Sequence, residues 1–321
     1  MKIAIPEAIA ALAACDEILL LTHRSPDGDT VGAASALCMA LRQLGKTAYL
    51  VADPDMTPKL RPFSEQFFAP EQFEPRFVCA IDCASSEQVC AAGRKYAERV
   101  DLCIDHHPSN TLFSSATLLD ADAAASAELV HEVICALGIP LTRELALPLY
   151  LGLATDSGCF RYADVTPRTL RYAAEMLATG IDFYSLNRKF FEEKSRGRLS
   201  LEQRIFDHAE YHGDAVFGCY TLADIAETGA DEDDRNNLAS VLMQVEDIKL
   251  ALLLRESASG EWKLSARSVP GVDACSVCAN FGGGGHITAA GATLNGNFDD
   301  IREKILAAAK REIDLRGLKW A

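Results

Sequence analysis

The sequence predicts an α/β protein, with a parallel sheet in its first part and a smaller α/β domain in its second part. Short apolar runs alternate with segments of helical periodicity over the first 180 residues, and this alternation is typical of a parallel sheet covered by helices. A second alternation of strand and helix patterns begins near residue 215. A chain of 321 residues is long enough for two such domains.

The predicted elements of the first domain follow one another closely. A first amphipathic helix is expected near the start, where "LAAC" (12–15) only superficially resembles a lipoprotein cleavage site. Buried strands are expected at 17–22, 47–52, 76–82 and 99–105. Helices are expected at 30–44, 124–137, 142–154 and 167–179, and the segment 55–75 is expected to be an irregular surface excursion.

The second domain is expected to follow a charged helical connector. The predicted boundaries are 1–185 for the first domain, 186–213 for the connector and 214–321 for the second domain. Strands are expected at 215–222, 248–255, 262–268 and 289–294, and helices at 231–245, 273–280 and 299–314. We expect the active site to lie in the cleft between the two domains.

Composition and charge limit the classes of partner. Hydrophobic residues make up 49% and charged residues 24%, as in ordinary globular proteins, and no apolar run is long enough to cross a membrane. The net charge of −15 disfavours long duplex nucleic acid, because affinity for its backbone grows with the number of phosphates neutralised. The 11 cysteines lack disulfide-like spacing, which indicates reduced thiols and a cytoplasmic protein.

Acidic and imidazole side chains follow several of the predicted strands and one predicted helix. They are His23, Asp27 and Asp29 after the first strand, Asp82 after the third, Asp105, His106 and His107 after the fourth, and Asp156 at the end of the helix 142–154. In an α/β sheet, ligands bind beyond the carboxyl ends of the strands. The sequence therefore predicts that these side chains meet at one edge of the sheet.

Each of these residues also has a simpler interpretation. An Asp after a strand, such as Asp29, is often the N-cap of the next helix, and a single His is more often packed or exposed than a ligand. Asp156 stands out because it lies among apolar and small residues, where a buried carboxylate is costly unless it is paired or bound to metal. Carboxylates mixed with imidazoles suit Mn²⁺, and the set exceeds the needs of one octahedral ion. Together they predict a two-metal site.

In this order the motifs resemble those of the DHH phosphoesterase superfamily. "HRSPDGD" (23–29) is similar to the first motif of that family, Asp82 to the second, "DHHPSN" (105–110) to the third and "ATDSG" (154–158) to the fourth. "ASAELV" (125–130) resembles the family's segment between the third and fourth motifs. Four ordered motifs are far more specific than any one alone.

The resemblance implies a role for each matching position. His23, Asp27 and Asp82 would bind one metal, and Asp29, Asp82, His106 and Asp156 would bind the other, with Asp82 bridging the two. His107 would face the substrate phosphate, and Asp105 would orient a histidine ligand. The implied cofactor is a pair of Mn²⁺ ions, with Mg²⁺ or Co²⁺ as substitutes.

The second domain resembles the DHHA1 domain found beside the DHH domain. "FGGGGHITAAGA" (281–292) is similar to its GGGH-x-x-AAG motif, and "WKLSARS" (262–268) to its S-x-R-S element. Glycines allow backbone N–H groups to approach a phosphate closely. The resemblance implies that Gly283, Gly284, Gly285, His286 and Arg267 bind the substrate.

The expected activity is Mn²⁺-dependent hydrolysis of short RNA or DNA oligonucleotides, in the manner of a 3′-5′ nano-RNase, and of 3′-phosphoadenosine 5′-phosphate (pAp), by two-metal hydroxide attack. The motifs do not separate this activity from a cyclic or linear dinucleotide phosphodiesterase. A nucleotide-binding regulator is the alternative from another class, although every proposed metal position is retained. Nucleotide phosphates are thus the expected partners, with no membrane partner. Homodimer formation, substrate length and direction of digestion are left open.

Overall fold

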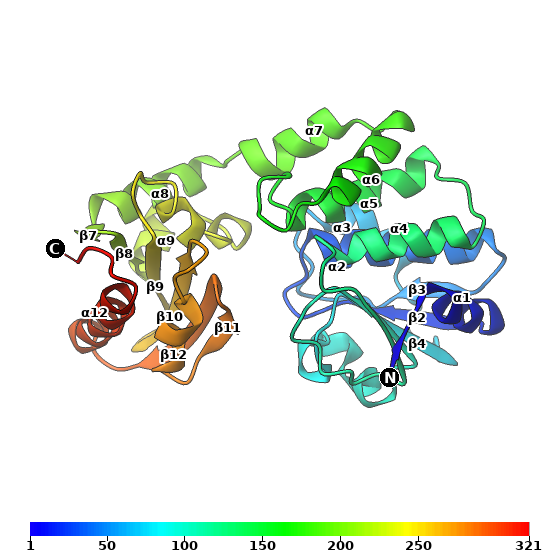
Figure 1. Cartoon of the computed structure of the whole chain (residues 1–321), viewed down its shortest axis with the longest axis horizontal. Helices are drawn as coiled ribbons and strands as arrows, with labels where there is room; N and C mark the ends of the chain where they lie inside the picture. The colour runs from blue at the N-terminus through cyan, green and yellow to red at the C-terminus, as the bar shows by residue number, and fades with distance from the viewer. Residues whose placement is uncertain (321) are drawn as a thin grey trace. The chain divides into compact units, whose positions relative to one another are not determined.

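The computed structural model describes residues 1–320, and the chain forms two compact units. Unit 1 spans Met1–Glu193, and unit 2 begins at Lys194 (Figure 1). Each unit has its own sheet and its own cluster of buried hydrophobic residues. The segment predicted as a connector is divided between them, because Phe190 and Phe191 pack on the core of unit 1 and Leu201 and Ile205 on that of unit 2.

The sheet of unit 1 consists of parallel strands in the order β1-β6-β5-β4-β2-β3. Its strands are β1 (Lys2–Ile3), β2 (Ile18–Leu21), β3 (Ala48–Leu50), β4 (Phe77–Ile81), β5 (Leu102–Asp105) and β6 (Ala116–Leu119). The four predicted strands are present, each somewhat shorter than expected. The predictions missed β6 and also β1, whose two residues are too few to show a hydrophobic period.

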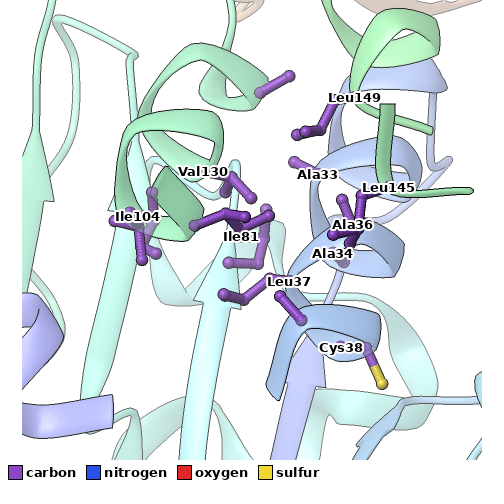
Figure 2. Close-up of a cluster of buried hydrophobic side chains, with 14 of the residues drawn as sticks. Ala33, Ala34, Ala36, Leu37, Cys38, Ile81, Ile104, Val130, Leu145 and Leu149 are labelled. Carbon is purple, nitrogen blue, oxygen red and sulfur yellow. The ribbon is translucent and has the colours of Figure 1, made fainter. Parts of the chain in front are cut away.

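The helices of unit 1 agree well with the predicted ones. They are α1 (Ile5–Ala14), α2 (Gly28–Gln43), α3 (Arg61–Ser64), α4 (Ser126–Ala136), α5 (Arg143–Asp156), α6 (Pro167–Ala178) and α7 (Phe183–Asn187). The core between α2, α4, α5 and the sheet is built from small and branched side chains (Figure 2). The other face of the sheet packs against the 3₁₀ helix η3 (Ala91–Arg99), which contributes Tyr96 and Ala97.

Unit 2 contains a mixed sheet in the order β11-β12-β10-β9-β8-β7, in which only β8 and β9 are parallel. Its strands are β7 (Glu210–His212), β8 (Ala215–Tyr220), β9 (Leu250–Ala258), β10 (Glu261–Ser268), β11 (Gly284–His286) and β12 (Ala289–Asn295). Its helices are α8 (Arg196–Asp207), α9 (Leu222–Thr228), α10 (Ala239–Leu242), α11 (Ala274–Ala279) and α12 (Phe298–Leu315).

One predicted helix of the second domain, 231–245, is wrong. The structure has a 3₁₀ turn at Asp233–Arg235 and the short helix α10 instead. The side chains of Asp231 and Asp234 accept hydrogen bonds from nearby backbone N–H groups, which offers the chain an alternative to helical bonding. Asn237 then adopts a left-handed conformation with φ 54°, which ends any helical path.

Among the described residues, no helix combines the length and the apolar character that crossing a membrane requires.

Candidate metal centre

The predicted site residues of unit 1 meet at the carboxyl edge of the parallel sheet. β2, β4 and β5 are neighbours in register, with Leu21 opposite Ala80 and Ile81 opposite Ile104. His23 follows β2, Asp82 follows β4, and His106 follows β5. The ends of two helices complete the site, since α2 begins beside Asp27 and α5 ends at Asp156.

Three groups of side chains at this edge are close enough to hold a metal ion. Within each group, one ligand atom of every residue lies within 4.8 Å of the others. The groups are His23 with Asp27 and Asp82, Asp29 with His106 and Asp156, and Asp82 with His106 and His107. Asp82 and His106 each belong to two groups, so the arrangement resembles two adjoining sites more than one.

Asp82 lies at the centre of these groups and is almost completely buried. Its Oδ2 lies 3.4 Å from Nε2 of His23, and its Oδ1 lies 3.5 Å from Nε2 of His106. Its backbone has φ 60°, a left-handed conformation that non-glycine residues seldom adopt and that often marks functional sites. One carboxylate thus faces an imidazole on each side.

The two aspartates of the first motif have different structural roles. Asp27 is the N-cap of α2, because its Oδ1 accepts hydrogen bonds from the N–H groups of Asp29 and Thr30. Asp29 is fully buried, and its carboxylate accepts from the N–H groups of Ser126 (2.6 Å) and Ala127 (2.9 Å) in the first turn of α4. The capping interpretation weighed for Asp29 therefore applies to Asp27, and both carboxylates still belong to the clusters.

Backbone carbonyls orient two of the histidines. Nδ1 of His106 lies 3.0 Å from the carbonyl oxygen of Ala123, and Nδ1 of His23 lies 2.9 Å from that of Arg24. A carbonyl oxygen can only accept, so Nδ1 carries the proton in each ring. Nε2 of each ring is directed at carboxylate oxygens, where a neutral imidazole offers a lone pair to a cation.

Asp105 orients His107 and not the proposed ligand His106, which differs from the expected role. Its Oδ1 lies 2.8 Å from Nδ1 of His107, and its Oδ2 accepts from the amide of Asn110 at 2.6 Å. Asp105 is completely buried, so this pair of hydrogen bonds satisfies a carboxylate that would otherwise be costly. His106 has the carbonyl of Ala123 as its partner instead.

The electrostatics of the site call for positive charge. Burial raises the pKa of Asp29 well above its usual value, and the neighbouring Asp82 and Asp156 raise it further. Burial lowers the pKa of His106, but hydrogen bonding to Asp156 and the charges of Asp82 and Asp29 outweigh it and raise that pKa to about 11. Burial also lowers the pKa of His23, but its neighbours Asp27 and Asp82 outweigh burial and raise that pKa. Positive charge on the two imidazoles offsets the repulsion among the carboxylates, and a divalent cation in the same place would offset it too.

The donor set fits a hard to borderline divalent cation. It combines carboxylate oxygens with the Nε2 atoms of His23 and His106, whose partners fix the rings so that those atoms face the carboxylates. In neutral rings these lone pairs would face carboxylate oxygens directly, an arrangement that a cation between them makes favourable. Carboxylate and imidazole ligands suit Mn²⁺, whereas soft metals prefer thiolates, and no cysteine belongs to these three clusters.

Ser126 is a site residue that the sequence reasoning missed. Its Oγ donates a hydrogen bond to Oδ1 of Asp82 at 2.9 Å, while its backbone N–H donates to Asp29. One residue therefore holds a carboxylate from each of two clusters. The only signal in the sequence was its position in "ASAELV", a segment noted for its resemblance to the family and not for any contact.

The predicted substrate-binding residues of unit 2 lie on β10 and on or just before β11, two strands that both pair with β12. Arg267 on β10 is opposite Ala289 on β12, and Ala289 is opposite His286 on β11. Side chains that pair directly across antiparallel strands project from the same face, so Arg267 and His286 share one face of this sheet. Nη1 of Arg267 also donates to the carbonyl of Ala266.

The three predicted glycines differ in why glycine is required. A Cβ atom on Gly283 would overlap the carbonyl of Gly291, and one on Gly285 would overlap that of Ala289. Gly285 also has φ 145°. A Cβ atom on Gly284 would meet nothing within 4 Å, so packing gives no reason for glycine there.

The fold and the site together define a class of protein. Residues 17–153 match the model of the DHH family, N-terminal domain, and residues 216–313 match the DHHA1 domain. The chain therefore belongs to the DHH family, in its form with a DHHA1 domain. This confirms the family expected from the motifs and, with it, the expected fold class.

Two relatives and one solved structure are similar to nearly the whole chain. The bifunctional oligoribonuclease and PAP phosphatase NrnA of Thermus thermophilus is 36% identical over 94% of this chain and 91% of its own length. The protein of the same name from Mycoplasma pneumoniae is 27% identical over 94% of both chains. Among solved structures, an exopolyphosphatase-related protein from Bacteroides fragilis has the same fold, with a TM-score of 0.89 at 22% identity, covering 98% of this chain and 97% of that chain.

Proposed function

We propose that this protein is a metal-dependent phosphoesterase that hydrolyses very short oligonucleotides and pAp, with two Mn²⁺ ions as cofactor. The observation that carries the proposal is the position of Asp82, which belongs to a cluster with His23 and Asp27 and to a second cluster with His106. The activities named for the Thermus and Mycoplasma relatives support the choice of substrate.

Each proposed ion has its own set of residues, with one carboxylate in common. One ion is assigned to His23, Asp27 and Asp82, and the other to Asp29, Asp82, His106 and Asp156. Two such cations supply Lewis acidity, which activates water and offsets negative charge on a phosphoryl group. Mg²⁺ and Co²⁺ are the proposed substitutes, since they accept the same ligand types.

His107 is assigned to the substrate phosphate. Burial lowers its pKa, but the hydrogen bond to Asp105 and the charges of Asp82 and Asp105 outweigh burial and raise it. The Asp105 contact holds a proton on Nδ1, and Nε2–H of the protonated ring is the proposed donor to a phosphate oxygen. His107 would therefore neutralise charge that develops during hydrolysis.

Unit 2 is proposed to bind the part of the substrate that does not react. Arg267 provides a planar guanidinium suited to a phosphate, and His286 lies on the same face two strands away. The small number of cations in these roles fits a short substrate. A net charge of −15 would repel a long strand, whereas a dinucleotide needs only local neutralisation.

The direct test is a substrate panel with Mn²⁺ that contains pAp, di- to pentanucleotides and cyclic dinucleotides. We expect turnover of pAp and of the shortest oligonucleotides, and Asp82→Ala should abolish it while leaving the fold intact by circular dichroism. Asp164→Ala, which removes an exposed carboxylate of the same unit, is the matched control. Turnover retained by Asp82→Ala would contradict the two-metal assignment, and exclusive turnover of cyclic dinucleotides would contradict the proposed substrate class.

Nucleotide recognition by Arg267 has its own test. Arg267→Ala should raise KM for pAp about 10-fold or more, because a charge-assisted contact to phosphate is lost. KM for bis-p-nitrophenyl phosphate, which has no nucleotide, should change far less. Equal effects on both substrates would show that Arg267 does not recognise nucleotide.

We also propose a cytoplasmic location, on the ground that the eleven cysteines are all free thiols and six of them are fully buried. A homodimer stays a prediction, to be checked by light scattering.

A further inference from the structure

The sheet of unit 2 has one face that is only partly covered. Trp262, Leu264 and Ala266 of β10 are buried on the first face, which packs against α11 and α12. The second face is covered over β8 and β9 by a cluster that includes Leu201 of α8 and Leu242 of α10. No buried residue of that cluster comes from β10, β11 or β12, so the second face is more open over these three strands.

Strand register arranges the side chains of this open face in three rows. The first row is His286, Ala289 and Arg267, which includes two proposed substrate-binding residues. The second row is Gly284, Gly291 and Ser265. The third row is Thr293, Lys263 and Arg255, the last contributed by β9. Two cationic rows therefore flank a row of very small residues.

The third row places two like charges directly opposite each other. Lys263 pairs with Arg255 across β10 and β9, an arrangement that costs stability in a sheet unless an anion offsets it. Within residues 1–320, neither side chain forms an ion pair with a carboxylate. Lys263 is exposed and Arg255 is half-buried beside Tyr220. The row is therefore an uncompensated cationic position on an open face.

The middle row consists of very small residues, and packing explains only one of its two glycines, since a Cβ atom on Gly291 would lie 3.1 Å from the carbonyl oxygen of Leu264. Gly284 has no close neighbour for a Cβ atom and no left-handed φ, so neither sterics nor conformation demands glycine. Gly291 lies inside a strand, where glycine weakens the sheet and often marks a place where a ligand approaches the backbone. Together with Ser265, these residues form a low floor between the two cationic rows.

We infer that this face binds a single-stranded oligonucleotide along β10, with Lys263 and Arg255 contacting a phosphate beyond the one held by Arg267 and His286. Lys263 and Arg267 are four residue steps apart on an extended strand, which is about 14 Å. One phosphate cannot reach both rows, so the second row serves only substrates longer than the shortest ones. This inference rests on the proposed function, and it makes Lys263 a residue that determines which substrate lengths bind well.

The test compares substrates of increasing length in the full-length chain. Lys263→Ala should raise KM for tetra- and pentaadenylate about 5-fold more than it raises KM for pAp. It should also reduce the slope of log binding constant against log salt concentration by about 1, the value expected for the loss of one phosphate contact. Lys263→Arg, which keeps the charge, should restore KM for the longer substrates. Lys304→Ala is the matched control, since it removes one lysine from α12 on the covered side of the sheet.

Equilibrium binding makes the result independent of turnover. Fluorescein-labelled pentaadenylate is titrated with the Asp82→Ala protein with and without Lys263→Ala, and inorganic polyphosphate is the competitor. If wild-type protein hydrolyses neither pAp nor oligonucleotides, the proposed function fails, while weaker pentaadenylate binding by Lys263→Ala still supports the inference. Equal effects on pAp and pentaadenylate, no effect at any length, or an effect confined to polyphosphate would each overturn it.

Discussion

Single residues at this site serve structure and ligand binding together. Ser126 begins α4, and it bonds Asp29 through its backbone and Asp82 through its hydroxyl. Asp27 caps α2 while its Oδ1 stays within 3.4 Å of Nε2 of His23. The helix ends and the carboxylates therefore contact one another, and these contacts orient the proposed ligand atoms.

Removing the hydroxyl of Ser126 tests this coupling. Ser126→Ala should weaken Mn²⁺ binding by about 10- to 100-fold, because Asp82 loses the partner that orients it. Calorimetric titration of metal-free protein measures the change. Ser35→Ala is the control, since its hydroxyl is also buried in unit 1 but has no hydrogen-bond partner. Unchanged affinity in Ser126→Ala would mean that the hydroxyl does not position Asp82.

The motifs predicted which residues gather, but not every contact among them. Asp27, Asp82 and His106 are signalled by their position after strands, because parallel strands end at one edge. The partner of Asp105 could not be predicted, since His106 and His107 are adjacent in sequence and only the backbone path decides which ring faces it.

At the scale of elements, close packing of α2 against α5 sets the position of the first motif. A Cβ atom on Gly32 would overlap the carbonyl of Pro148, and one on Gly152 would lie 2.7 Å from Oδ1 of Asp29. The close neighbour of Gly32 is therefore the helix α5. The glycines allow the ligand-bearing ends of α2 and α5 to meet.

Gly32→Ala should therefore destabilise unit 1. Overpacking against a backbone carbonyl costs about 1–3 kcal/mol, which outweighs the gain of about 1 kcal/mol in helix propensity. Urea denaturation measures the loss in the free energy of unfolding, with Ser35→Ala on the same helix for comparison. A stability equal to wild type would show that the two helices separate at no cost.

Elements with a clear hydrophobic period were predicted well, and the others were not. Strand β4 and helix α12 were found within a few residues of their observed bounds. The failures are short or polar segments, such as β7, α9 and the false helix at 231–245, where local hydrogen bonds and tertiary pairing decide the structure.

At the scale of the whole molecule, the acidic cluster links stability to pH and metal. In metal-free protein the pKa of His106 is raised to about 11 from an unfolded value near 6.5, and that of His23 is also raised. A raised pKa contributes stability that is complete below the unfolded pKa and is lost as pH rises through the folded one. The free energy of unfolding should thus decrease between about pH 7 and pH 10.

Urea denaturation in EDTA at pH 7, 8 and 9 tests this expectation. The decrease is at most about 1.4 kcal/mol per pH unit for each histidine. Saturating Mn²⁺ should reverse the trend, because metal and protons compete for the same atoms. His106→Gln should flatten the decrease in metal-free protein. A free energy that rises with pH without metal would contradict the assignment.

The sequence by itself determined the family and the fold class, and it predicted which side chains gather at the edge of the sheet. It could do so because a parallel sheet brings the ends of its strands to one edge, whatever the loops do. Only the tertiary structure decided that Ser126 joins Asp29 to Asp82, that Asp105 serves His107, and that Lys263 faces Arg255. Each of these contacts depends on how the backbone places two side chains that a local sequence pattern does not relate. Strand register and helix packing decide which residues meet, and neither can be inferred from a local pattern.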